Sequence, residues 1–97
     1  MFIGKVIGNV WATRKHAALD GSKLLLVSPA EPFTEDLLGP AALAVDTVSA
    51  GIGDIVLVLD EGGSARKMLG RESAPVRTVI CGIVDQVNSG GRIKKYG

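Results

Sequence analysis

ALAVDTVSAGIGDIVLVLD, residues 42–60, contains two β-rich runs separated by a segment made almost entirely of small residues. The runs cover about 42–48 and 54–60, and glycine between two short apolar runs predicts two strands joined by a turn. The second run includes five consecutive apolar residues at 55–59 with no alternation. A strand of this kind is usually buried on both faces, so its outer face requires a cover.

Similar short runs lie on both sides of this segment. Strands are predicted near 2–13, 23–28 and 76–87, with a further short one at 92–96. Thirteen glycines in 97 residues support a small barrel, whose strands bend sharply and whose backbones approach closely.

Helix is scarce by comparison. The best candidate covers 64–69, where Gly62 and Gly63 turn the chain and Ser64 can cap the helix. A surface excursion at 29–39 is expected to contain one helical turn near 34–38. We therefore predict a mainly all-β fold, a small five-stranded OB-like antiparallel β-barrel with one short helix.

Chain length and composition predict one domain that covers residues 1–97 and associates with other protein. A chain of 97 residues is too short for two independent cores without disulfides or metal. Hydrophobic residues make up 46% and charged residues only 22%, which is more apolar material than one small core needs. Because so little helix is available to cover the apolar strands, another subunit is expected to cover them.

Charge and cysteine content exclude several classes of protein. Eleven basic and ten acidic residues leave a net charge of +1, which provides no strong attraction to nucleic acid or anionic membrane. The single Cys81 lies in an apolar run and is interpreted as a small buried hydrophobe. The first residues lack a signal-peptide pattern, and no apolar run approaches the roughly 18 residues of a membrane span. We expect a cytoplasmic protein.

The residues offer little chemistry for catalysis. His16 and Cys81 are the only residues of their types, too few for a transition-metal site within one subunit or a convincing nucleophilic arrangement. The glycines at 51 and 53 open a strand, and no third glycine follows at the dinucleotide spacing. No enzyme activity, cofactor or metal is expected.

A second interpretation is a small OB-like module that binds nucleic acid or a ligand. Six basic residues could form a patch: Arg14, Lys15, Lys23, Arg92, Lys94 and Lys95. Aromatic residues make up only 4% of the chain, too few for the stacking platforms that such modules use. Solvated charge is therefore the better interpretation of these basic residues.

Several blocks of sequence, in order along nearly the whole chain, resemble the EutN/CcmL family of bacterial microcompartment vertex proteins. The blocks are 4–8 (GKVIG), 12–15 (ATRK), 19–27 (LDGSKLLLV), 44–58 (AVDTVSAGIGDIVLV), 63–66 (GSAR), 75–76 (PV) and 82–85 (GIVD). The resemblance implies a non-catalytic shell protein whose barrel forms a homopentamer. It also implies that the pentamer closes the vertices of a polyhedral, carboxysome-like shell otherwise made of hexameric proteins.

Two sites are predicted within such a ring. The small residues Ser49, Ala50, Gly51, Ile52 and Gly53 are expected to approach the fivefold axis or a neighbouring subunit, because small residues permit close backbone contact. Arg66 is expected to form a charge-assisted hydrogen bond, within the subunit or across the interface, with Asp46 and Asp54 as candidate acceptors.

Overall fold

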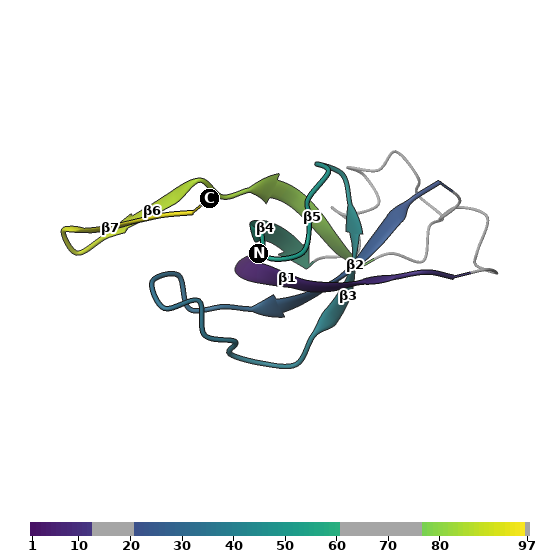
Figure 1. Cartoon of the computed structure of the whole chain (residues 1–97), viewed down its shortest axis with the longest axis horizontal. Coiled ribbons are helices and arrows are strands. Elements are labelled where there is room, and N and C mark those ends of the chain that lie inside the picture. Colours follow the sequence, from purple (N-terminus) through teal and green to yellow (C-terminus); the bar gives the residue numbers. More distant parts are fainter. Residues whose placement is uncertain (13–20, 61–76, 97) are drawn as a thin grey trace.

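Seven strands make up the regular structure of the computed structural model, which describes residues 1–12, 21–60 and 77–96. Five of them close a barrel in the order β1-β2-β3-β5-β4, and two form a separate hairpin, β6-β7 (Figure 1). The strands are β1 (Phe2–Val10), β2 (Lys23–Pro29), β3 (Ala42–Asp46), β4 (Ile55–Asp60), β5 (Thr78–Ile83), β6 (Gln86–Ser89) and β7 (Arg92–Lys95).

The predicted five-stranded barrel is confirmed, but it is not antiparallel throughout. Strands β3 and β5 run parallel, with Val45 opposite Val79 and Asp46 opposite Ile80, while the other four pairings of the barrel are antiparallel. The reason is topological. In a closed ring of five strands the directions cannot alternate all the way round, so at least one neighbouring pair must be parallel.

Other expectations need correction. The strand predicted at 76–87 is divided, because β5 ends at Ile83 and β6 begins at Gln86 as part of the hairpin. The helical turn expected near 34–38 is absent; a turn at 32–34 and an isolated bridge between Ala30 and Leu37 take its place. The helix predicted at 64–69 lies outside the described residues. Among those that are described, no helix is long and apolar enough to cross a membrane.

The barrel interior is filled by aliphatic side chains from all five of its strands. Its fully buried cluster consists of Val6, Leu25, Val27, Ala44, Ala50, Val56, Val58 and Ile80. A register irregularity in β1 between Val6 and Gly8 interrupts simple alternation along that strand. The outer face retains apolar residues that the subunit itself leaves uncovered, among them Ile7, Leu43 and Ile83, each at least 40% exposed.

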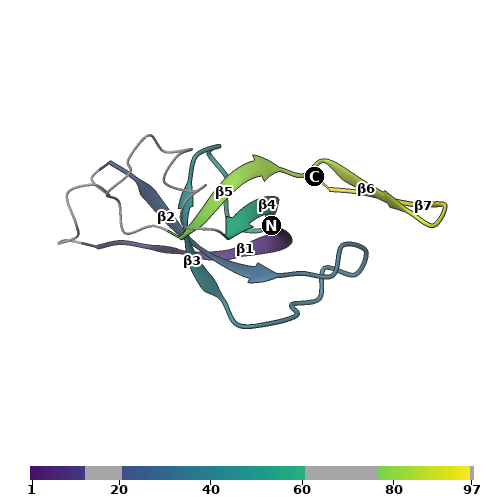
Figure 2. The ribbon, with the colours of Figure 1, turned by 180° about the vertical axis from the view of Figure 1, so that it is seen from behind.

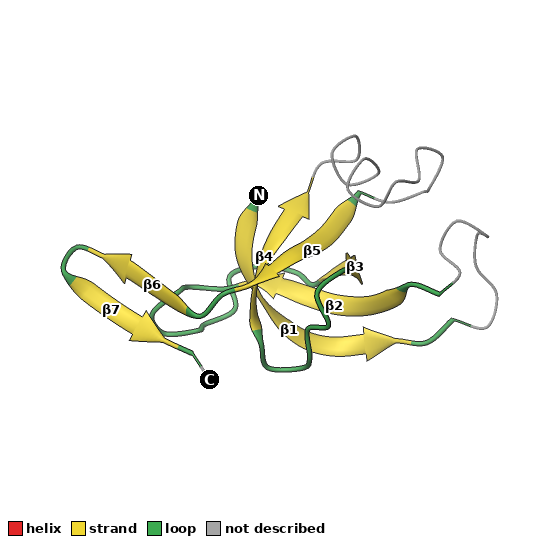
Figure 3. Cartoon of the chain, turned by 90° about the horizontal axis from the view of Figure 1, so that it is seen from above, coloured by secondary structure: helices red, strands yellow, loops and turns green. Residues whose placement is uncertain are grey.

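The hairpin, residues 86–96, is called the arm below. It extends away from the barrel in the two side views and when seen from above (Figures 1, 2 and 3). The arm accounts for one end of a molecule that measures 45 × 24 × 22 Å.

Candidate functional site: the loop between β3 and β4

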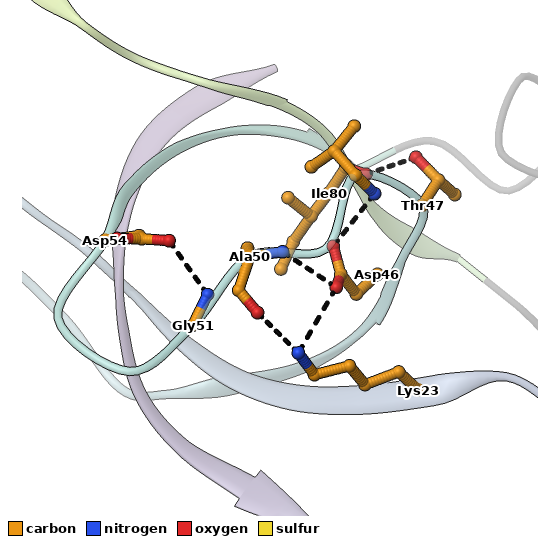
Figure 4. A network of polar contacts seen from close by, with 8 residues as sticks. Lys23, Asp46, Thr47, Ala50, Gly51, Asp54 and Ile80 are labelled. Atoms are coloured by element: carbon orange, nitrogen blue, oxygen red, sulfur yellow. Dashed lines mark hydrogen bonds and ion pairs between the residues drawn. The ribbon is translucent and has the colours of Figure 1, made fainter.

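The β3–β4 loop, residues 47–54, is held by the carboxylate of Asp46 at the end of β3. One oxygen, Oδ1, accepts the backbone N–H of Val48 at 3.1 Å, and the other, Oδ2, accepts that of Ala50 at 2.9 Å (Figure 4). The side chain of Asp46 is only 1% exposed. A buried carboxylate needs such donors, because without them its desolvation would be costly.

Lys23 joins this loop to β2. Its Nζ donates a hydrogen bond of 2.6 Å to the carbonyl oxygen of Ala50 and lies 3.7 Å from Oδ2 of Asp46 (Figure 4). The Lys23 side chain is 53% exposed, so the ammonium keeps contact with water while it partly balances the buried charge. The sequence interpretation of Lys23 as solvated charge is therefore incomplete.

The second half of the loop is closed by Asp54. Its Oδ2 accepts the N–H of Gly51 at 2.8 Å, and its own N–H donates to the carbonyl of Gly51 at 3.0 Å. The loop is also tied to β1, since Gly53 donates to the carbonyl of Val6 at 2.8 Å. Gly53 has φ +95°, which favours glycine, and Ser49 also has positive φ, at +60°.

These contacts determine what the loop can offer to a partner. Ala50 is fully buried and belongs to the barrel core, whereas Ile52 at the tip is 64% exposed. Of the residues 49–53 that were predicted to approach a neighbour, Ala50 therefore packs inside its own subunit and cannot add contact area. Ile52 and the glycines beside it form the accessible part of the predicted contact.

The predicted acceptors for Arg66 already have partners. Asp46 accepts two backbone N–H groups and lies near Lys23, and Asp54 accepts Gly51. Arg66 itself lies outside the described residues, so its role stays a prediction.

The contact between Lys23 and Asp46 was not predicted from the sequence. A lone lysine before an apolar run carries no sequence signal for a partner 23 positions away.

The connection on the other side of β3, residues 30–41, is here called the excursion. Oε2 of Glu31 accepts the backbone N–H groups of Phe33 at 2.8 Å and Thr34 at 2.7 Å. The hydrogen bond from Thr34 is the main reason that the pKa of Glu31 is lowered. At its far end the excursion is fastened to β2, where Ser28 Oγ donates to the carbonyl of Gly39 at 2.7 Å.

None of this resembles a catalytic or metal centre. No group of three or more potential metal ligands occurs in the ranges 1–12, 21–60 and 77–96. Cys81 is half-buried and its thiol lies 3.5 Å from the carbonyl of Leu57, consistent with a packing role. The fold and loop together define a small closed β-barrel with a hydrogen-bonded inter-strand loop and uncovered apolar surface.

Comparison with known proteins identifies the family. Residues 1–85 match the model of the family described as ethanolamine utilisation protein EutN/carboxysome. The vertex protein GrpN of Rhodospirillum rubrum is 43% identical over 91 residues, which cover 92% of this chain and 98% of the relative. The vertex protein EutN of Escherichia coli K12 is 38% identical over 93 residues, or 96% of each chain.

Solved structures agree with this result. CcmL of Nostoc sp. PCC 7120 superposes with a TM-score of 0.85 at 36% identity, covering 96% of both chains. The structure of GrpN from R. rubrum, described as a pentameric microcompartment shell protein, has a TM-score of 0.79 at 39% identity and covers 92% of this chain and 99% of its own. The chain belongs to the EutN/CcmL family.

Proposed function

We propose that this protein is a structural subunit of a bacterial microcompartment shell and forms homopentamers that close the vertices of the shell. The observation that supports this most directly is similarity over more than nine-tenths of the chain to GrpN, a pentameric shell protein. On this proposal the subunit works in the cytoplasm beside hexameric shell proteins and has no catalytic role. The alternative of a nucleic-acid-binding module receives no support from these relatives.

The outer surface of the barrel suits a ring. A closed ring of identical subunits uses a heterologous interface, in which one patch contacts a different patch on the next copy. Uncovered apolar residues lie on the outer face of β1 and β3, at Ile7 and Leu43, and at the end of β5, at Ile83. Each subunit of such a ring has two different neighbours, so patches at two places on the barrel can both be covered.

Native mass spectrometry tests the ring. Five copies of the 10.1 kDa chain give a mass of about 50.5 kDa, and we expect that species to dominate at micromolar concentration. A sample that stays at 10.1 kDa throughout would contradict the proposal.

Within the ring, we expect the tip of the β3–β4 loop to lie at the fivefold axis or against a neighbour. Ile52→Asp tests this, because Ile52 is exposed in the subunit and a charge there should leave the barrel folded by circular dichroism. A buried charge at the contact should weaken the pentamer or, at the axis, repel its four symmetry copies. Ile52→Val is the matched control. If Ile52→Asp assembles like the wild type, the loop is not a subunit contact.

A further inference from the structure

The arm, residues 86–96, is joined to the barrel by a short connection between β5 and β6 (Figure 3). Among the residues that the structure describes, no strand of the barrel is hydrogen-bonded to either strand of the arm. Within the connection, the N–H of Val84 donates to the carbonyl of Ile55 on β4 at 2.8 Å, whereas the carbonyl of Asp85 accepts the N–H of Tyr96 at 3.0 Å. Val84 is thus tied to the barrel and Asp85 to the arm, so the backbone between them sets the direction of the arm.

A cavity of about 310 Å³ lies beside this connection. Its lining includes Ile55 and Ile83 of the barrel, Glu35 of the excursion, and Lys95 and Tyr96 of the arm. Packed protein interiors contain few voids larger than a water molecule, so a cavity of this size means that arm and barrel are not packed together here. The barrel strands therefore do little to hold the arm in one direction.

Contacts with the excursion hold the arm instead. The side chains of Arg92, Lys94 and Tyr96 alternate along β7 and its end, so they share a face. The Arg92 guanidinium lies 4.1 Å from the centroid of the Phe33 ring, and the hydroxyl of Tyr96 donates to the carbonyl of Pro32. One face of the arm therefore lies against the excursion.

Glu35 connects the excursion with both the arm and the barrel. Its Oε2 lies 3.5 Å from Nζ of Lys94 on the arm, and its Oε1 lies 3.5 Å from Nζ of Lys5 on β1. The adjacent carboxylate, Asp36, forms no salt bridge with any described residue. One carboxylate of the excursion thus bridges two parts of the molecule that are separate in sequence.

The backbone of Glu35 is also unusual. Its φ is +63°, in the left-handed region that is costly for any residue with a side chain. The turn around it is closed by two hydrogen bonds of 2.8 Å, from the N–H of Glu35 to the carbonyl of Glu31 and from the N–H of Glu31 to the carbonyl of Asp36. Strained residues of this kind persist where the surroundings hold them, and they cluster at sites of function. The strain at Glu35 accompanies a side chain that bridges three segments.

The contacts of Glu35 are weak enough to be released. The side chains of Lys5, Glu35 and Lys94 are 32%, 29% and 36% exposed, so water reaches all three charged groups. Ion pairs in contact with solvent contribute little to stability, and salt screens them. An isolated two-stranded hairpin is itself only marginally stable in water, so the arm depends on such contacts.

We propose that Glu35 is the positioning residue of a releasable latch, which holds the arm against the excursion. When both salt bridges of Glu35 are broken, the arm turns about the backbone between Val84 and Asp85. The arm carries Ile93, which is 64% exposed, so the latch decides where this apolar side chain is presented. The latch lies within one subunit and does not depend on the proposed ring.

Hydrogen–deuterium exchange of the arm amides tests the latch, because a hairpin that loses its supporting contacts opens more often. Glu35→Gln should raise exchange rates in residues 86–95 by about threefold or more, as the loss of two partly exposed ion pairs predicts, while the barrel strands stay unchanged. Asp36→Asn is the matched control and should exchange like the wild type. Raising NaCl from about 0.1 M to about 1 M should speed exchange in the wild-type arm and have a smaller effect in Glu35→Gln.

Glu35→Gly separates the side chain from the backbone strain. Glycine adopts this φ freely, so the urea midpoint of Glu35→Gly should be at or above that of Glu35→Gln, yet its arm should also exchange faster than that of the wild type. Lys94→Met and Lys5→Met each remove one salt bridge, and each should speed exchange in the arm. Native mass spectrometry checks that all proteins are compared in the same oligomeric state.

The outcomes separate the parts of the inference. Arm exchange that stays at the wild-type rate in both Glu35 variants would overturn the latch, as would an equal rise in the barrel strands or in Asp36→Asn. A wild-type arm that exchanges like an unstructured peptide would overturn it too, because nothing would then hold the arm. If only Lys5→Met has no effect, the bridge to β1 is overturned and the arm is held by the excursion alone.

Discussion

The two connections that flank β3 use the same chemical device in different surroundings. In the β3–β4 loop, Asp46 accepts two backbone N–H groups while its side chain is only 1% exposed. In the excursion, Glu31 also accepts two backbone N–H groups, but it lies at the surface, only partly covered. Water can therefore replace the donors of Glu31 more readily than those of Asp46.

Because both carboxylates accept two backbone N–H groups, we expect burial, and not the number of hydrogen bonds, to decide how much stability is lost when each carboxylate is removed. Removing one partner of a buried polar contact leaves the other unsatisfied, whereas at the surface solvent makes up most of the loss. We therefore expect the β3–β4 loop to resist change as part of the core. The excursion should be easier to alter, although it positions the arm.

The largest loss of folding stability is expected when Asp46 is substituted. Asp46→Ala leaves the N–H groups of Val48 and Ala50 without their acceptor and should lower the free energy of unfolding by about 2–4 kcal/mol. Asp46→Asn retains one oxygen acceptor and should lose less. Urea denaturation of the three proteins measures the difference. A change below about 0.5 kcal/mol for Asp46→Ala would show that the buried carboxylate is not what holds the loop.

A backbone test within the same loop compares two glycines. At Gly53, with φ +95°, a Cβ would meet no atom within 4 Å, so any cost of Gly53→Ala comes from backbone strain alone, about 1–2 kcal/mol. At Gly51, where φ is not positive, a Cβ would meet only Oδ2 of Asp54 at 3.9 Å, an ordinary contact. Gly51→Ala should therefore be close to neutral. Equal thermal stability of the two variants would contradict this account.

An intermediate loss of folding stability is expected when Lys23 is substituted. Lys23→Met keeps the aliphatic stem but removes the donor to the carbonyl of Ala50, and it should lower the free energy of unfolding by about 1 kcal/mol because the ammonium is half exposed. Lys95→Met removes a lysine that forms no salt bridge with a described residue and serves as the control. If both variants lose the same stability, the contact of Lys23 with the loop contributes nothing specific.

The smallest effect is expected at Glu31 and depends on pH. The folded protein lowers the pKa of Glu31 below its usual 4.5, so its stabilising contribution is present above pH 4.5 and is lost as pH falls through the folded value. The wild type should therefore be more stable than Glu31→Gln at pH 7, and the difference in their free energies of unfolding should shrink as the pH falls to 3. Urea denaturation midpoints of both proteins over this pH range measure the difference. A constant gap over this range would indicate that Glu31 does not anchor the excursion through its charge.

Much of the fold could be predicted because its signals are local. The apolar run at 55–59 became most of β4, and the short runs at 23–28 and 92–96 became β2 and β7 with small shifts at their ends. The family is equally visible in sequence, since ordered blocks along the chain specify it without knowledge of any contact. Strand β5 was predicted too long because periodicity does not show where a strand leaves one sheet to join another.

The contacts between distant segments were decided only by the tertiary structure. Lys23 meets Asp46, and Arg92 meets Phe33, because barrel closure and the path of the arm bring separate segments together. Ala50 shows the same limit, since its small size predicted a contact while the fold placed it in the core. Local sequence determines which segments form strands, where the chain can turn and how much apolar surface there is. Which side chains are buried and paired depends on how five strands close, because closure sets the neighbours of every residue at once.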